Sequence, residues 1–109
     1  MEPSDYCIIT TTTETQENAD SITRSLLQKH LAACIQASTI QSTFRWQGEI
    51  TVSQEILLQM KTKRSLFARI KQEIEALHTY EVPEIIMVPL QGGNTSYFEW
   101  IENETRGEH

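Results

Sequence analysis

The chain of 109 residues lacks a long apolar run. No uncharged apolar stretch approaches the ~18 residues that a membrane-spanning helix needs. The first twenty residues are polar and acidic, without the basic start and apolar centre of a signal peptide. We therefore expect no membrane partner and a cytoplasmic location.

Basic residues are also few. Nine Lys and Arg stand against fifteen Asp and Glu, which gives a formal net charge of −6. The basic residues are scattered, so no basic stripe could follow a phosphate backbone. An aromatic strand of the RNP type is absent as well. Nucleic acid is therefore not expected as a partner.

The sequence has two cysteines, Cys7 and Cys34, and no internal repeat, low-complexity tract or linker rich in Pro, Gly or Ser. A chain of this length with 39% hydrophobic residues can form a core without disulfides or a structural metal. Without a linker, residues 1–109 are predicted to form a single domain. Its predicted parts are a folded core, 5–102, and two frayed tails, 1–4 and 103–109.

Segments typical of strands and of helices follow one another along the chain. Runs of β-branched and aromatic residues indicate strands, and apolar residues three or four apart indicate helices. Gln47-Gly48 is a hairpin turn signal, Ser65 is expected to cap a helix, and Ser96 with Glu99 has the spacing of a capping box. The predicted strands are 6–13, 34–46, 50–62 and 84–88, and the predicted helices are 16–33, 65–77 and one from 94 or 95 to 101.

This order, βαββαβ plus a terminal helix, predicts the α+β fold class. With right-handed crossovers it folds most simply as a ferredoxin-like sandwich with an antiparallel sheet of strand order 4-1-3-2. The third strand then separates the first from the second, so Cys7 and Cys34 would lie roughly 9 to 10 Å apart. This exceeds the ~7 Å limit for a disulfide, and we expect two free thiols.

The second strand, 34–46, is much longer than the first and the fourth. Because strands usually have ~5 to 6 residues, part of this hairpin would extend past the sheet and leave backbone N–H and C=O groups unpaired. Another copy of the chain could satisfy these groups with its own strands. The pattern therefore predicts a closed homo-oligomer.

Five short motifs then stand in a familiar order: LAAC at 31–34, WQG at 46–48, Glu55 followed by KT at 61–62, HTYEVPE at 78–84 and YFEWI at 97–101. Together they resemble the CutA divalent-cation tolerance family, over about residues 5–102. The resemblance implies a ferredoxin-like protomer, a tightly interlocked homotrimer, and an association with copper and other divalent metal ions.

The resemblance also identifies two positions at which this chain differs from members with proposed copper ligands. Thr11 stands where those members have a cysteine at the end of the first strand, and Leu77 stands where some have a second histidine. A hydroxyl is a far poorer copper ligand than a thiolate. Only His78 remains of the implied ligand set.

His78 is therefore the predicted metal ligand, because a short proline-fixed connector after a helix holds its imidazole in place. Glu84, with Glu81 beside it, could add oxygen ligands to a weak divalent-ion site for Cu²⁺. The alternative for His78 is a packed ring that interacts with the helix dipole. The carboxylates could equally be solvated, or could protect the edge of the strand that Pro83 introduces.

A ligand pocket is the second candidate site. Glu55 and Lys61 lie six residues apart on one strand, so their side chains share a face and could form an ion pair. Trp46 and Tyr80 could supply the walls, with Glu84 again nearby. The alternatives are a rim salt bridge worth ~0 to 1 kcal/mol, and aromatic packing in the core or at a subunit interface.

Two functional hypotheses follow. The first is a non-enzymatic homotrimer that responds to divalent metal ions such as copper, with weak metal sites at subunit clefts. The second is a trimeric small-molecule sensor that uses inter-subunit pockets. An enzyme is not expected, because the sequence shows neither a nucleophile–base pair nor a closed set of metal ligands.

Overall fold

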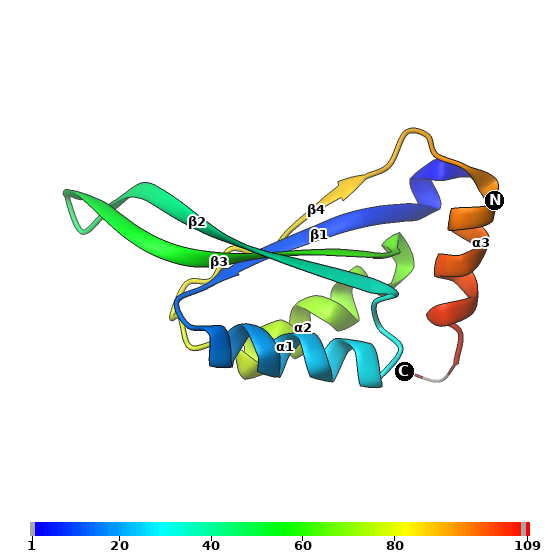
Figure 1. Cartoon of the computed structure of the whole chain (residues 1–109), viewed down its shortest axis with the longest axis horizontal. Helices are drawn as coiled ribbons and strands as arrows, with labels where there is room; N and C mark the ends of the chain where they lie inside the picture. The colour runs from blue at the N-terminus through cyan, green and yellow to red at the C-terminus, as the bar shows by residue number, and fades with distance from the viewer. Residues whose placement is uncertain (1, 108) are drawn as a thin grey trace.

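The computed structural model describes residues 2–107 and 109. It has one sheet of four antiparallel strands in the order β2-β3-β1-β4, with α1 and α2 on one side of the sheet and α3 at one end of it (Figure 1). The predicted α+β ferredoxin-like fold and its strand order are confirmed. The strands are β1 (Tyr6–Thr13), β2 (Cys34–Trp46), β3 (Glu49–Lys63) and β4 (Ile86–Pro89), and the helices are η1 (Pro3–Asp5), α1 (Gln16–Gln28), η2 (Arg64–Leu66), α2 (Phe67–Leu77) and α3 (Thr95–Glu104).

The helices α1 and α2 cover one face of the sheet, as Figure 1 shows. Alternate side chains of β1 and β3 point toward these helices and are fully buried, as the period of two in a strand requires. They meet the apolar stripes of the helices, for example Ile22 and Leu26 of α1 and Ile70 of α2. This contact makes the main hydrophobic core.

The other face of the sheet is covered only at one end, by α3. Tyr6 of β1 stacks on Phe98 of α3 with a ring-centroid distance of 4.8 Å, and Ile101 completes this second cluster. Farther along the same face, Ile86 and Val88 of β4 are exposed. We call this uncovered part the open face of the sheet.

Three helix boundaries differ from prediction. The first helix was expected to reach residue 33 but ends at Gln28, because His30 adopts a left-handed backbone with φ 56°. The expected N-cap Ser65 lies inside η2 instead, and Leu66 precedes α2 without a side-chain cap. Leu31, which was expected on the apolar stripe of this helix, follows the turn instead and is still fully buried in the core.

The last helix starts after Asn94 as expected, but it forms no capping box at Ser96 and Glu99. Asn94 is the N-cap, and its side chain donates to Ser96 Oγ at 2.9 Å. The helix also runs three residues past the expected end at 101, to Glu104. Thr105 is fully buried and donates to the carbonyl of Ile101, so this part of the expected tail is packed.

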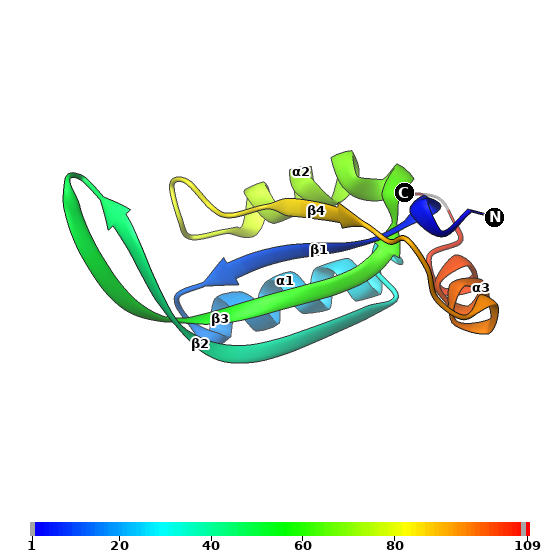
Figure 2. The ribbon, with the colours of Figure 1, turned by 90° about the horizontal axis from the view of Figure 1, so that it is seen from above.

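The β2–β3 hairpin extends beyond the sheet, as predicted, and forms what we call the arm (residues 40–55). In β3, residues 56–61 pair with both β1 and β2 and residues 62–63 with β1 alone, whereas residues 49–55 pair with β2 alone. Figures 1 and 2 show the arm projecting past the ends of α1 and α2. The hairpin turn has positive φ at Gln47 (50°) and Gly48 (80°), which matches the twist of the two strands.

The predicted absence of a disulfide also agrees with the structure. Cys7 on β1 pairs with Thr62 of β3, and Cys34 on β2 pairs with Lys61 of β3. The strand β3 therefore lies between the two cysteines. Both thiols are free. Burial raises the pKa of the Cys7 thiol to about 11, which keeps it protonated and unreactive.

Candidate functional site

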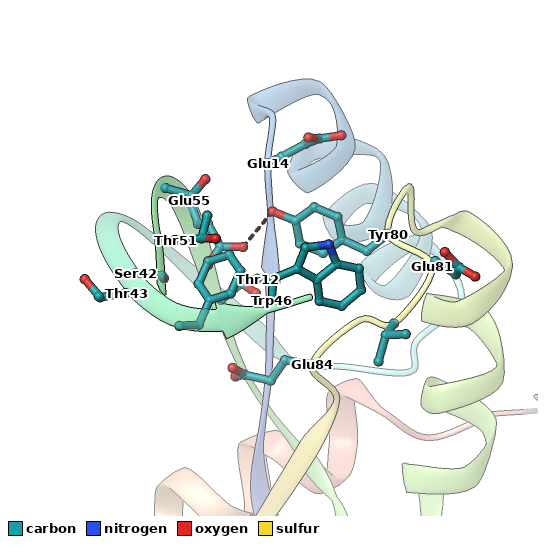
Figure 3. Close-up of a pocket in the computed structure, with 13 residues that line it drawn as sticks. Thr12, Glu14, Ser42, Thr43, Trp46, Thr51, Glu55, Tyr80, Glu81 and Glu84 are labelled. Atoms are coloured by element: carbon teal, nitrogen blue, oxygen red, sulfur yellow. Dashed lines mark hydrogen bonds between the residues drawn. The ribbon is translucent and has the colours of Figure 1, made fainter. Parts of the chain in front are cut away.

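A cleft of about 720 Å³ lies where the arm leaves the sheet. One wall is a single face of the arm, because Phe44 and Thr51 are opposite each other across the hairpin and point the same way. The end of β1 forms the floor, and the connector between α2 and β4 forms the other wall (Figure 3). Residues 80–84 of the connector thus line the same cleft as residues of the arm, although the two segments are far apart in the sequence.

Four glutamates line the cleft, and no lysine, arginine or histidine is among its lining residues. Three aromatic side chains supply apolar surface, and serine and threonine hydroxyls fill the spaces between. The cleft therefore attracts cations and repels anions. The glutamates are Glu14, Glu55, Glu81 and Glu84, and the aromatic residues are Phe44, Trp46 and Tyr80.

The central contact of the cleft joins Tyr80 to Glu55. The Tyr80 hydroxyl donates to Glu55 Oε2 at 2.6 Å, drawn as a dashed line in Figure 3. Burial, together with this carboxylate, raises the pKa of Tyr80 well above its usual value. The phenol therefore stays protonated and keeps donating. Glu55 is only 7% exposed, the most buried of the four glutamates.

His78 positions Tyr80 for its hydrogen bond with Glu55. Its Nε2 lies 2.7 Å from the carbonyl oxygen of Thr12, and its Nδ1 accepts from the backbone N–H of Tyr80 at 3.0 Å. A carbonyl can only accept, so we assign the neutral tautomer with the proton on Nε2. The imidazole also packs against the Tyr80 ring, with centroids 5.0 Å apart. His78 thus holds Tyr80 in place.

This arrangement does not fit a metal ligand at His78 within one protomer. One ring nitrogen carries a proton and the lone pair of the other is used, so neither is free for a metal ion. Glu84 accepts from the hydroxyl of Thr10 at 3.1 Å and is not hydrogen-bonded to His78. Within residues 2–107 and 109, no group of three or more His, Cys, Asp or Glu side chains could hold a metal ion.

The expected ion pair between Glu55 and Lys61 is wrong. Six residues of extended strand span roughly 20 Å, so a shared face does not bring the two side chains together. Glu55 binds Tyr80, and Lys61 donates instead to the side chain of Gln36 on the neighbouring strand. Lys61 lies outside the cleft of its own protomer.

The other residues proposed for a ligand pocket do meet. Trp46, Glu55, Tyr80 and Glu84 all line the cleft, and Glu81 joins them at its rim. Trp46 is 46% exposed, so it is not packed in the protomer core.

Sequence reasoning missed Glu14 and Phe44. Phe44 could have been found from its spacing, because it lies two residues before Trp46 on the same face of the strand. Glu14 directly follows β1, but no local pattern distinguishes it from a solvated loop residue.

The comparisons with known proteins agree with this architecture. The CutA1 divalent ion tolerance protein family matches residues 7–104. The divalent-cation tolerance protein CutA of Thermus thermophilus is 37% identical over 99 residues, which cover 90% of this chain and 96% of that protein. The chloroplastic CutA of Arabidopsis thaliana is 35% identical, over 91% of this chain but only 55% of the plant protein.

A solved structure shows the same fold. The periplasmic divalent cation tolerance protein CutA of Archaeoglobus fulgidus superposes with a TM-score of 0.91 at 33% identity, over 93% of this chain and 99% of that one. In the part of the chain that is described here, no helix is both long and apolar enough to cross a membrane. On the match of residues 7–104 and the identity to several relatives, the chain belongs to the CutA1 divalent ion tolerance family.

Proposed function

We propose that this protein is a homotrimeric divalent-cation response protein whose working site is the cleft at the base of the arm. The observation that carries the proposal is the lining of this cleft, with four carboxylates and no basic side chain. Such a lining concentrates cations from solution. The names of the relatives, which refer to divalent-cation tolerance, support the same class of ligand.

Assembly is supported by surfaces that the protomer leaves uncovered. The arm has unpaired backbone edges, and its outer face carries Ile50 and Val52 with 69% and 60% of their surface exposed. Ile86 and Val88 are exposed on the open face of the sheet. These are two different surfaces, so their pairing between copies would be head-to-tail, the kind of contact that forms a ring when the rotation between copies closes. The number three comes from the family resemblance.

The chemistry of the cleft favours hard divalent ions. Carboxylate oxygens suit Mg²⁺, Ca²⁺ and Mn²⁺, whereas copper prefers nitrogen and sulfur ligands. The ligand set of one described protomer is incomplete. We therefore expect weak binding that needs residues of a neighbouring copy, and copper binding at His78 and Glu84 is the least favoured form of the proposal.

The test combines mass and metal titration. Light scattering at micromolar concentration should give three times the mass of the 12.5 kDa chain. Calorimetric titrations with Mn²⁺ and Cu²⁺ should show weak binding that Glu84→Gln reduces for Mn²⁺. Glu75→Gln is the control, because Glu75 is exposed on α2 and does not line the cleft. A monomer, or metal curves that no cleft variant changes, would refute the proposal.

A second function, small-molecule sensing, is favoured by one observation: Phe44, Trp46 and Tyr80 give the cleft an apolar wall that a bare metal ion does not need. A thermal-shift screen with metabolites tests it, because a ligand at 100 times its Kd adds about 2.7 kcal/mol of stability.

A role without catalysis and a cytoplasmic location stay predictions, and relatives are named for the chloroplast and the periplasm.

A further inference from the structure

We propose that the cleft binds a small organic cation, an ammonium or guanidinium group carried on an apolar body. The inference rests on the proposed function in using the same cleft, but it names a different class of cation. Three features carry it: one buried carboxylate without a cationic partner, an aromatic wall beside it, and a volume that suits an organic molecule.

Glu55 is the first feature. The residue is 93% buried, yet among the described residues no lysine, arginine or histidine forms an ion pair with it. Tyr80 donates to Oε2, and no described residue donates to Oε1. Among the described residues, Thr11 Oγ1 is the only buried side-chain oxygen or nitrogen without a partner, so Glu55 Oε1 is still reached by solvent. Because Glu55 lines the cleft, a cation that enters the cleft can supply the missing charge.

The aromatic wall is the second feature. Trp46 and Tyr80 line the same cleft as Glu55, and Figure 3 labels all three side chains. Phe44 extends the same wall along the arm. Aromatic faces attract organic ammonium and guanidinium ions through their quadrupoles, and they also pack against the apolar part of the ligand. Glu55 and the Tyr80 ring that it contacts offer surfaces for the charged and the apolar half of such a molecule, and Phe44 and Trp46 extend the apolar wall.

The third feature is the volume of the cleft, together with the lack of converging side chains that could coordinate a metal ion. The cleft of about 720 Å³ lies in the range of pockets for small organic ligands. A bare divalent ion needs several oxygen or nitrogen atoms converging within about 2.0 to 2.6 Å. Within residues 2–107 and 109 no three His, Cys, Asp or Glu side chains converge in this way. An organic cation needs only one close carboxylate, and the rim glutamates then raise its local concentration.

The experiment uses Trp46 as the reporter. Trp46 and Trp100 are the only tryptophans in the chain, so Trp100→Phe leaves the cleft residue as the sole source of tryptophan fluorescence. The assembled full-length variant is titrated with benzylammonium, benzyl alcohol and benzoate, which share one apolar body and carry charges of opposite sign or none. We expect saturation by benzylammonium with a Kd of about 1 mM or lower, at least about tenfold tighter than benzyl alcohol, and no saturation by benzoate.

Glu55→Gln isolates the charge, because the amide oxygen can still accept from Tyr80. It should weaken benzylammonium at least about tenfold and leave benzyl alcohol unchanged. Glu75→Gln, outside the cleft, should change neither. If Glu55→Gln fails to fold by circular dichroism, the rim variant Glu81→Gln replaces it, with an expected loss of about twofold.

Equal affinity for benzylammonium and benzyl alcohol overturns the inference, as does an unchanged affinity in Glu55→Gln. Binding to dilute, dissociated protein but not to the assembled form also overturns it, because a basic side chain of another copy then fills the cleft. The proposed function fails on different readouts, oligomer mass and Mn²⁺ titration. A protein that binds Mn²⁺ without discriminating among the three benzyl probes retains the proposed function and loses this inference.

Discussion

The two halves of β3 have similar sequence patterns and opposite surroundings. Residues 56–63 pair with β1, and all but the last two also pair with β2; in this half Leu58, Met60 and Thr62 are fully buried. Residues 49–55 belong to the arm, where Ile50 and Val52 are among the most exposed apolar side chains of the chain. The alternation of side chains is the same, but in residues 49–55 only Glu55 is buried, where it contacts Tyr80. The part of the sheet covered by helices, which we call the body, therefore supplies the stability of the protomer, and the exposed arm is free to contact another copy of the chain.

The sharpest test of this contrast applies one substitution to both regions. Ile22→Ala removes a fully buried side chain of α1 and should lower the free energy of unfolding by about 2 to 5 kcal/mol, through lost burial and a cavity. Ile50→Ala on the arm should leave the secondary structure of the protomer intact and reduce the oligomer mass instead. Urea unfolding and light scattering measure the two effects. If Ile50→Ala unfolds the protomer as Ile22→Ala does, the two regions are one cooperative unit.

The next largest effect is expected at the junction between the regions. His78→Ala removes the donor to the Thr12 carbonyl and the acceptor of the Tyr80 N–H, and should cost about 1 to 3 kcal/mol in urea unfolding. His30→Asn is the matched control. His30 is exposed and has a left-handed backbone that Asn tolerates, so we expect a change below about 0.5 kcal/mol. Equal effects would mean that His78 does not hold the cleft wall.

A pH effect is expected in the body, where Glu73 of α2 receives hydrogen bonds from Lys29, Arg69 and Ser25. These bonds lower the pKa of Glu73 to about 2. A depressed pKa in the folded state gives stability that is present above the usual carboxyl pKa, near 4.5, and is lost as the pH falls toward 2. Unfolding at pH 7 and pH 3 should show about 1 to 2 kcal/mol less pH dependence in Glu73→Gln, after allowance for screening by solvent.

Glu75 provides the control for this pH test. It pairs with Lys71 at 3.4 Å, and about half of each side chain is exposed. Glu75→Gln should therefore change the free energy of unfolding by less than about 0.5 kcal/mol at either pH. A pH profile altered equally by both variants would contradict the role of Glu73 as the link between α1 and α2.

The smallest effect is expected at the tip of the arm. Gly48 has φ +80°, so Gly48→Ala strains the turn by about 1 kcal/mol, although a Cβ there meets no atom within 4 Å. The change should raise hydrogen exchange of the arm amides and leave those of β1 protected. Gly92→Ala has equal space and no positive φ, and should have no effect. Loss of protection in β1 would show that the arm and the body unfold together.

Much of the fold could be predicted from the sequence, because strand and helix periodicities are local. The helix boundary at His30 could not, because a left-handed residue there lets Leu31 turn back into the core. The site was predictable only in part. Trp46, Glu55, Tyr80 and Glu84 line one cleft, and ligand binding there stays a prediction, whereas Lys61 was placed there on the basis of its face alone. A shared face says nothing about distance along a strand.

The sequence by itself determined the order of the elements, the long hairpin and the acidic character of the chain, because each depends on residue types over short spans. Only the tertiary structure decided that His78 has no free nitrogen, that Glu55 is buried beside Tyr80, and that Glu14 shares their cleft. The hydrogen bond between Tyr80 and Glu55 joins residues 25 apart, and that between His78 and Thr12 joins residues 66 apart; hydrogen bonds between such distant segments have no local signature.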